Sequence, residues 1–208
     1  MQFKLINASS DHPPPPSDPS SASFTLTAKA GVDIWRTPES AGGRDDFAGV
    51  ILATELKLKS FNRATVKVSA DWKSQYAQGG LILFSSSGNS SSSSPNPPLW
   101  IKTGIEFEDK KLFASVVAAN PYSDWSLQPW KESTLTVEAI RERNGLWIYA
   151  IDGEERLPLR QLTWAFEGQD QGKDIQVGVF AAMPKGLEGV EGGGELTVKF
   201  EDFVVETL

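Results

Sequence analysis

Short segments in which apolar and polar residues alternate recur along the chain, and they constrain its fold more than any other feature. Successive side chains of a strand point to opposite faces, so a period of two indicates half-buried strands. The clearest examples are 23–27, 61–71 and 135–141, and further strands are predicted at 99–107, 112–120, 147–151, 155–162, 175–182 and 195–205. Roughly a dozen strands at this spacing are typical of a two-sheet antiparallel sandwich or jelly roll, an all-β fold.

Turn signals separate several of these segments. Asn144-Gly145 is the strongest hairpin signal, and Asp152-Gly153 and Asp109-Lys110 are expected to form further tight turns. The Pro/Ser-rich segments 11–22 and 85–98 are predicted to be mobile loops, and the glycine-rich segment 186–194 a flexible connector. A chain of 208 residues with this pattern fits a single β-sandwich domain over 1–208.

Composition excludes several classes of function. The net charge of −7 disfavours nucleic acid as a partner, and no run approaches the roughly 20 apolar residues of a membrane span. Cysteine is absent, which excludes thiol catalysis and fits an intracellular, cytoplasmic protein. The single histidine, His12, precedes a run of prolines, so neither a Ser-His-Asp triad nor a zinc site is expected. We expect no cofactor and no metal. Asp45 and Asp46 could bind calcium, but a solvated acidic loop is the favoured interpretation.

The segment 99–107 carries the most informative polar residues. Alternation places Trp100, Lys102 and Glu106 on one face with Gly104 between them, and Ile101, Ile105 and Phe107 on the other. The apolar set belongs to a core. The other set offers a ring for stacking, a hydrogen-bond donor and an acceptor, so this face is the predicted binding surface.

Other residues are expected to join this surface in the groove of a concave sheet. The predicted ligand-binding residues are Trp35, Tyr76, Gln78, Trp100, Asn120 and Trp125, and the predicted catalytic group is Glu106, Lys102 and Asp124. Lys102 and Glu106 lie about 13 Å apart along an extended strand, so each needs another partner, and Asp124 is a candidate for Lys102. The alternative is that these tryptophans are core residues, as is common in sandwiches.

Several motifs resemble a family of domains of unknown function whose best-known member is the yeast regulation-of-enolase protein. They are Asp33-Ile-Trp-Arg36, Gln75-Tyr-Ala-Gln-Gly-Gly-Leu81, Trp100-Ile-Lys-Thr-Gly-Ile-Glu-Phe107, Ser115-Val-Val117, Tyr122-Ser-Asp-Trp-Ser126, Val177-Gly-Val-Phe-Ala-Ala182 and Val198-Lys-Phe-Glu-Asp-Phe203. The resemblance covers the chain from about residue 33 to its end. It implies a concanavalin A-like two-sheet jelly roll. One position departs from the family pattern, because Ala77 stands where an aspartate is usual.

Three functions remain open. The leading one is binding of a small ring-bearing or carbohydrate-like ligand in the groove. The second is an enzyme on a small metabolite, an isomerase, cyclase or pericyclic catalyst, in which oriented binding supplies the rate. The third, implied by the resemblance alone, is regulation through contact with a metabolic enzyme. Glycoside hydrolysis by Glu106 and Glu108, about 7 Å apart along a strand, is disfavoured because Glu108 adjoins a turn and the Glu-x-Asp-x-x-Glu motif of laminarinases is missing.

Overall fold

The computed structural model describes residues 1–85, 98–143, 145–166 and 173–208, and almost all regular structure in these ranges is β. The strands are β1 (Phe3–Ile6), β2 (Phe24–Lys29), β3 (Ile34–Arg36), β4 (Asp45–Phe47), β5 (Val50–Lys57), β6 (Phe61–Ser69), β7 (Gln78–Ser85), β8 (Trp100–Glu108), β9 (Lys111–Ala119), β10 (Ser123–Trp130), β11 (Thr134–Glu142), β12 (Gly145–Asp152), β13 (Glu155–Leu162), β14 (Asp174–Ala182) and β15 (Glu195–Thr207). Three 3₁₀ turns join them: η1 (Glu39–Ala41), η2 (Leu58–Ser60) and η3 (Glu191–Gly193).

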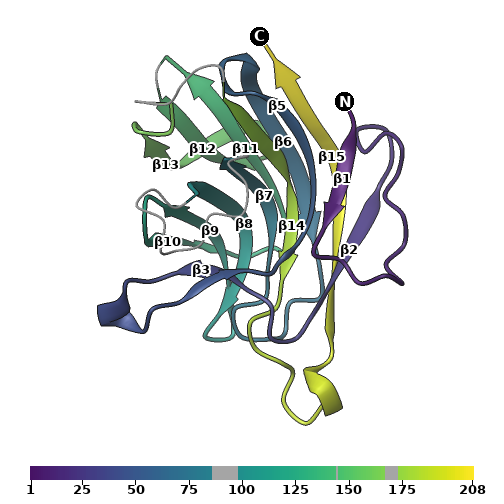
Figure 1. Ribbon diagram of the computed structural model, residues 1–208. Coiled ribbons are helices and arrows are strands. Elements are labelled where there is room, and N and C mark those ends of the chain that lie inside the picture. The colour runs from purple at the N-terminus through teal and green to yellow at the C-terminus, as the bar shows by residue number, and fades with distance from the viewer. Residues whose placement is uncertain (86–97, 144, 167–172) are drawn as a thin grey trace.

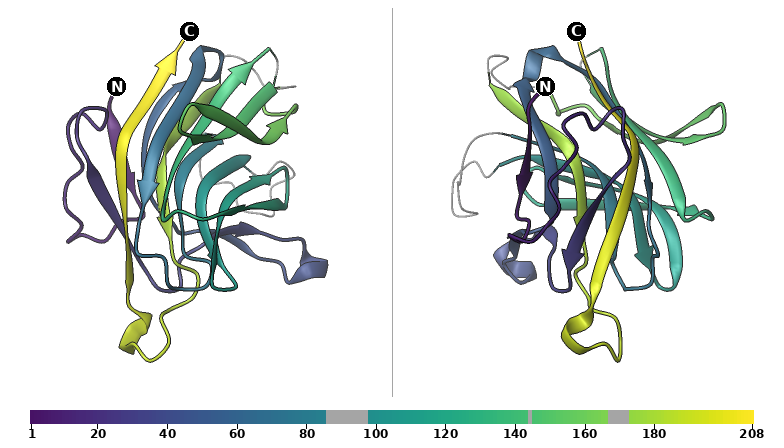
Figure 2. Two further views of the ribbon diagram at one scale, coloured as in Figure 1. Left: turned by 180° about the vertical axis from the view of Figure 1, so that it is seen from behind. Right: turned by 90° about the vertical axis from the view of Figure 1, so that its right-hand side faces the viewer.

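Two antiparallel sheets face each other, as the all-β prediction requires (Figures 1 and 2). One has seven strands in the order β1-β5-β14-β7-β8-β9-β10, and the other has six in the order β13-β12-β11-β6-β15-β2. Neighbouring strands are mostly distant in sequence, so the sheets are tied together by non-local pairing. This is the two-sheet sandwich predicted from the alternating segments.

The main core fills the space between the sheets. On β7 and β8 it takes Leu81, Leu83, Ile101 and Ile105. A second apolar cluster lies on the opposite face of the seven-stranded sheet and contains Ile34, Ile51, Ala53, Ile82, Trp100, Val117, Ala119, Phe180 and Ala182. The seven-stranded sheet is therefore covered on both faces near its centre.

The cover over the second cluster is the short hairpin of β3 and β4, which extends from the sandwich beside β8 to β10 (Figure 1). Arg36, only 4% exposed, holds this hairpin in place. Its guanidinium donates to the carbonyls of Pro98 (2.9 Å) and Pro121 (3.1 Å) and pairs with Asp45 (2.6 Å). Its backbone N–H donates to Ser123 Oγ on β10 (2.8 Å). The hairpin is thus a fixed third layer.

The structure corrects the sequence prediction in two strands. β5 is not predicted by alternation, because the run 50–53 is apolar throughout. Its side chains are buried on both faces, Leu52 in the main core and Ile51 in the second cluster, which explains the continuous pattern. The segment 122–126 lies outside the strands predicted above, which places it in a loop, but residues 123–126 form the first half of β10 and pair with β9.

The predicted turns are found where the structure describes them. Asp109 and Lys110, with φ of 47° and 60°, join β8 to β9, and Gly153 (φ 60°) joins β12 to β13. β11 and β12 form the expected hairpin, although Asn144 itself lies outside the described residues. So do 86–97, most of the predicted mobile loop 85–98. In the described part of the chain, no helix is both long and apolar enough to span a membrane.

Candidate functional site

A cavity of about 220 Å³ lies on the outer face of the seven-stranded sheet, meaning the face that points away from the six-stranded sheet. Its lining residues are Asp33, Trp35, Arg44, Tyr76, Gln78, Glu106, Trp125 and Pro184. This volume corresponds to about seven water molecules in the liquid. Pockets for drug-sized ligands span roughly 300–1,000 Å³, so only a small molecule fits inside.

Three aromatic rings wall this cavity at steep angles to one another. The Trp35 and Trp125 ring centroids lie 6.0 Å apart with planes at 85°. Those of Tyr76 and Trp125 lie 6.4 Å apart at 71°. Trp35 comes from the covering hairpin, Tyr76 from the segment before β7, and Trp125 from β10, so three separate parts of the chain build the aromatic wall.

Glu106 supplies a carboxylate to the cavity from β8. Its Oε2 accepts hydrogen bonds from Ser115 Oγ (2.7 Å) and Trp125 Nε1 (3.1 Å). No hydrogen bond from the described residues reaches its other oxygen, Oε1. Burial raises the pKa of Glu106, against the opposing effects of Lys102 and of these two hydrogen bonds. The cavity therefore holds one carboxyl group whose orientation is fixed and whose second oxygen is available.

Lys102 lies beneath the cavity and does not line it. Its Nζ donates to the carbonyl of Ile34 (2.6 Å) and to Gln78 Oε1 (2.6 Å), and Asp33 Oδ1 is 4.0 Å away. The side chain is 3% exposed, and burial lowers the pKa of its ammonium group. Lys102 thereby joins the hairpin to the sheet and orients the Gln78 amide, which does line the cavity.

Asp33 and Arg44 form the charged rim of the cavity. Arg44 pairs with Asp33 Oδ2 at 2.9 Å and also with Asp46. Asp33 Oδ1 accepts from the backbone N–H of Ile34 at 2.8 Å. Both charges of the rim therefore have protein partners, and Asp45 and Asp46 are paired with arginines instead of forming a solvated loop.

Two glycines allow β7 and β8 to approach closely between Lys102 and Glu106. Gly80 on β7 and Gly104 on β8 lie directly opposite each other. A Cβ on Gly104 would be 1.9 Å from the carbonyl oxygen of Gly79, and one on Gly80 would be 1.9 Å from that of Thr103. Only glycine permits this approach of the two strands, so Gly104 is a structural requirement of the site.

Six of the nine predicted site residues belong to this site or support it. Trp35, Tyr76, Gln78, Glu106 and Trp125 line the cavity, and Lys102 lies beneath it. β8 turns Trp100, Lys102 and Glu106 to the outer face, as its alternation predicts, but the hairpin covers Trp100 and Lys102, so of these three only Glu106 lines the cavity.

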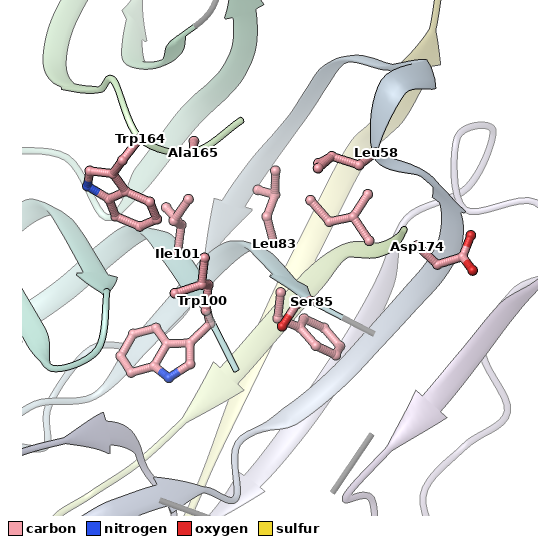
Figure 3. A pocket seen from close by; sticks show the side chains of 11 residues that line it. Leu58, Leu83, Ser85, Trp100, Ile101, Trp164, Ala165 and Asp174 are labelled. Carbon is pink, nitrogen blue, oxygen red and sulfur yellow. The ribbon is translucent and has the colours of Figure 1, made fainter. Parts of the chain in front are cut away.

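The other three predicted residues lie elsewhere. Trp100 is 1% exposed within the second cluster, and its indole points away from Ile101 and Leu83 (Figure 3). Asp124 pairs opposite Ala118 and so faces the six-stranded sheet, where its carboxylate is 3.6 Å from Arg160. Asn120 is an exposed residue after β9. The prediction that Asp124 pairs with Lys102 is wrong, because Asp124 lies in β10 on the inner face of the seven-stranded sheet, whereas Lys102 points to the outer face.

Sequence reasoning also missed functional residues. Asp33, Arg44 and Pro184 line the cavity, and Ser115 fixes Glu106. Ser115 is the one polar residue between Ala114 and Ala119 on β9, which was an available signal. Glu108 would be the second carboxylate in glycoside hydrolysis, the reaction that the sequence disfavours. It accepts a hydrogen bond from Gln75 and does not line the cavity.

A second, much smaller cavity lies near one end of the main core, between residues such as Leu58, Leu83, Ile101 and Trp164 (Figure 3). Its volume of about 30 Å³ is that of about one water molecule. It cannot hold an organic ligand.

The fold and the cavity define a β-sandwich protein of the concanavalin A-like class, with a small, partly covered site on its seven-stranded sheet. Comparison with protein families gives the closer assignment. The model of the family described as protein of unknown function (DUF1349) matches residues 11–208, so the chain belongs to that family. An uncharacterized protein of Emericella nidulans is 39% identical over 188 residues, which is 89% of this chain and 86% of the relative.

Solved structures agree on the fold. A functionally unknown protein from Saccharomyces cerevisiae aligns with a TM-score of 0.74 at 23% identity, covering 100% of this chain and 97% of its own. The GH43 protein BlXynB of Bacillus licheniformis aligns with a TM-score of 0.55 at 15% identity, over 88% of this chain and 33% of its own. At these identities the likeness shows a shared jelly-roll fold and no shared activity.

Proposed function

We propose that the cavity on the seven-stranded sheet binds a small ring-bearing or carbohydrate-like molecule. The observation that carries this proposal is the combination of three aromatic walls with Glu106, whose Oε1 has no partner among the described residues. Apolar walls with a few fixed polar groups are typical of small-molecule sites.

In the bound state a ring would lie against the indole of Trp125 or Trp35. A hydroxyl or amine of the ligand would donate to Glu106 Oε1. The Gln78 amide would fix the orientation of the ligand in the cavity. The Gln78 amide is itself held by Lys102, so the polar side of the site is preorganised before binding.

The test is a titration of the protein with monosaccharides and small cyclic metabolites, read by tryptophan fluorescence and by the thermal unfolding midpoint. We expect at least one compound to shift both signals, and Trp125→Ala and Glu106→Gln to abolish the shift. Trp130→Phe is the matched control, because the Trp130 indole bonds to Thr134 and lies outside the cavity. An unchanged response in Trp125→Ala would contradict the proposal.

A second candidate is an enzyme in which Glu106 moves a proton on a bound metabolite. It is favoured by the burial that raises the pKa of Glu106, because a carboxyl group with a raised pKa holds a proton more readily and can transfer it as a general acid. Incubation of the binding compounds with the protein, followed by mass spectrometry and chiral chromatography, tests it. Conversion that persists in Glu106→Gln would exclude this role.

Regulation of a metabolic enzyme and a cytoplasmic location both stay predictions. A docking surface for such an enzyme would require an exposed apolar patch. The exposed large apolar residues of the described chain come instead from five separate segments: Met1, Tyr122, Leu157, Val190 and Leu208.

A further inference from the structure

The outer face of the six-stranded sheet carries a stack of flat groups along β12. The guanidinium carbon of Arg156 lies 4.1 Å from the ring centroid of Tyr149. The Tyr149 ring is followed by that of Trp147, with centroids 5.9 Å apart and planes 15° from parallel. Trp147 and Tyr149 are two residues apart and share a face, and the next position on that face is Gly145. The stack therefore ends at Trp147.

A cavity of about 550 Å³ occupies the place where the stack would continue. Its lining residues are Glu142, Arg143, Gly145, Trp147, Gln161 and Thr163. Tyr149 covers one side of the Trp147 ring and does not line the cavity, so the cavity lies on the Gly145 side. We call this space the Gly145 slot.

The strand register explains the polar sides of the slot. Gly145 lies opposite Glu142 on β11, and Trp147 lies opposite Gln161 on β13. Thr163 follows two residues after Gln161 and so comes beside Gly145. One aromatic face is thus flanked by polar side chains from both neighbouring strands.

Gly145 is not needed for its backbone conformation. Its φ is outside the left-handed region, and an added Cβ would be 3.4 Å from the flexible Gln161 amide, close to ordinary contact. What glycine provides here is space. The polar walls also have unused hydrogen-bonding capacity, because the side chains of Arg143, Gln161 and Thr163 make no hydrogen bond with the described residues.

We propose that the Gly145 slot is a second binding site and takes the ring of a neutral sugar, with its apolar face against Trp147. A sugar ring matches a single aromatic face bordered by both donors and acceptors. Glu142, which pairs with Arg156 at 3.5 Å, brings a carboxylate to the slot, and the chain carries a net charge of −7, so a phosphate-bearing ring such as a nucleotide is disfavoured. The slot is on the surface, which leaves room for neighbouring sugar units.

Affinity electrophoresis in native gels that contain β-glucan, arabinoxylan or galactomannan tests this proposal. We expect at least one polysaccharide to retard the protein relative to a polysaccharide-free gel. Trp147→Ala should weaken binding by about tenfold, the upper range for one aromatic stacking contact. Gly145→Leu should abolish it by filling the slot, and Trp147→Tyr should retain most of it.

Two controls make the result specific to this slot. Circular dichroism and thermal unfolding of each variant show whether the sandwich is intact. Trp130→Phe changes a tryptophan that lines neither cavity and should leave retardation unchanged. The proposal is overturned if no polysaccharide retards the protein, or if retardation survives both Trp147→Ala and Gly145→Leu. Retardation that is lost in Trp125→Ala alone would assign the sugar to the first cavity and also overturn it.

Discussion

The two outer faces of the sandwich both carry charged and aromatic side chains, but they differ in how far these side chains are exposed to solvent. On the seven-stranded sheet the polar residues of β8 are buried, with Lys102 2% and Glu106 5% exposed. On the six-stranded sheet the side chains of Arg156 and Glu142 remain 44% and 39% exposed. The difference comes from the β3–β4 hairpin, which adds a third layer to one face. The alternation of a strand therefore determines which face of the sheet a side chain points to. Whether that face is buried or exposed to solvent depends on a segment distant in sequence, here the β3–β4 hairpin.

The charges are satisfied differently on the two faces. Under the hairpin, Lys102 bonds to two neutral oxygens and stands 4.0 Å from Asp33. On the open face, Glu138 lies between Arg63 and Arg156 in direct ion pairs. Glu138 itself is 5% exposed, but the side chains of Arg63 and Arg156 are 30% and 44% exposed, so solvent can partly replace these arginines. Substitution of either arginine should therefore cost less than substitution of Lys102.

The largest expected effect is that of Gly104→Ala. The added methyl group would meet a backbone carbonyl at 1.9 Å, and no side-chain rotation relieves that contact. We expect the free energy of unfolding to fall by about 4 kcal/mol in urea denaturation. Gly145→Ala on the other sheet is the matched control and should change it by less than about 1 kcal/mol. Equal stability of the two variants would contradict the close approach of β7 and β8.

Lys102→Met should have the next largest effect. It leaves the carbonyl of Ile34 and Oε1 of Gln78 buried without a donor, at a cost of about 3 kcal/mol. Lys67→Met, on the six-stranded sheet, breaks a 3.5 Å pair with Glu201 that is largely solvated and should cost less than about 0.5 kcal/mol. If urea denaturation gave the two variants the same stability, the hairpin would not be a fixed cover.

The third prediction concerns pH. Because burial raises the pKa of Glu106 above its usual 4.5, the folded state keeps a proton that the unfolded state releases as pH rises past that value. The unfolding free energy due to this group therefore decreases with rising pH. Glu106→Gln cannot titrate, so its stability relative to the wild type should increase from about pH 4.5 upward, measured by urea denaturation at a series of pH values.

Ser115→Ala sharpens this test. The Ser115 hydrogen bond lowers the pKa of Glu106, so its loss should move the pH-dependent window further upward. Parallel pH profiles for the wild type and Glu106→Gln would show that Glu106 titrates as it does in the unfolded chain.

The sequence was sufficient for the sandwich and for the phase of β8, because alternation is a local property. It was not sufficient for the cover. β3 and β4 are three residues each, too short for a periodic signal, and the contact from Ile34 to Lys102 joins residues 68 apart. The sequence therefore predicts the same ligand-binding role for Trp100 and Trp125. In the structure Trp100 is buried under the hairpin, whereas Trp125 lines the cavity beside it.

The smallest expected effect is that of Arg156→Met on the open face. Arg156 pairs with Glu138 and stacks on Tyr149, but its side chain is 44% exposed, so water and Arg63 replace much of what is lost. We expect a loss of about 0.5–1 kcal/mol at low salt and a smaller one at 1 M salt, where surface charges are screened. Urea denaturation at both salt concentrations measures this. If Arg156→Met lowered the free energy of unfolding as much as Lys102→Met, the ion pairs of the six-stranded sheet would be as shielded from solvent as Lys102. The proposed difference between the two faces would then be wrong.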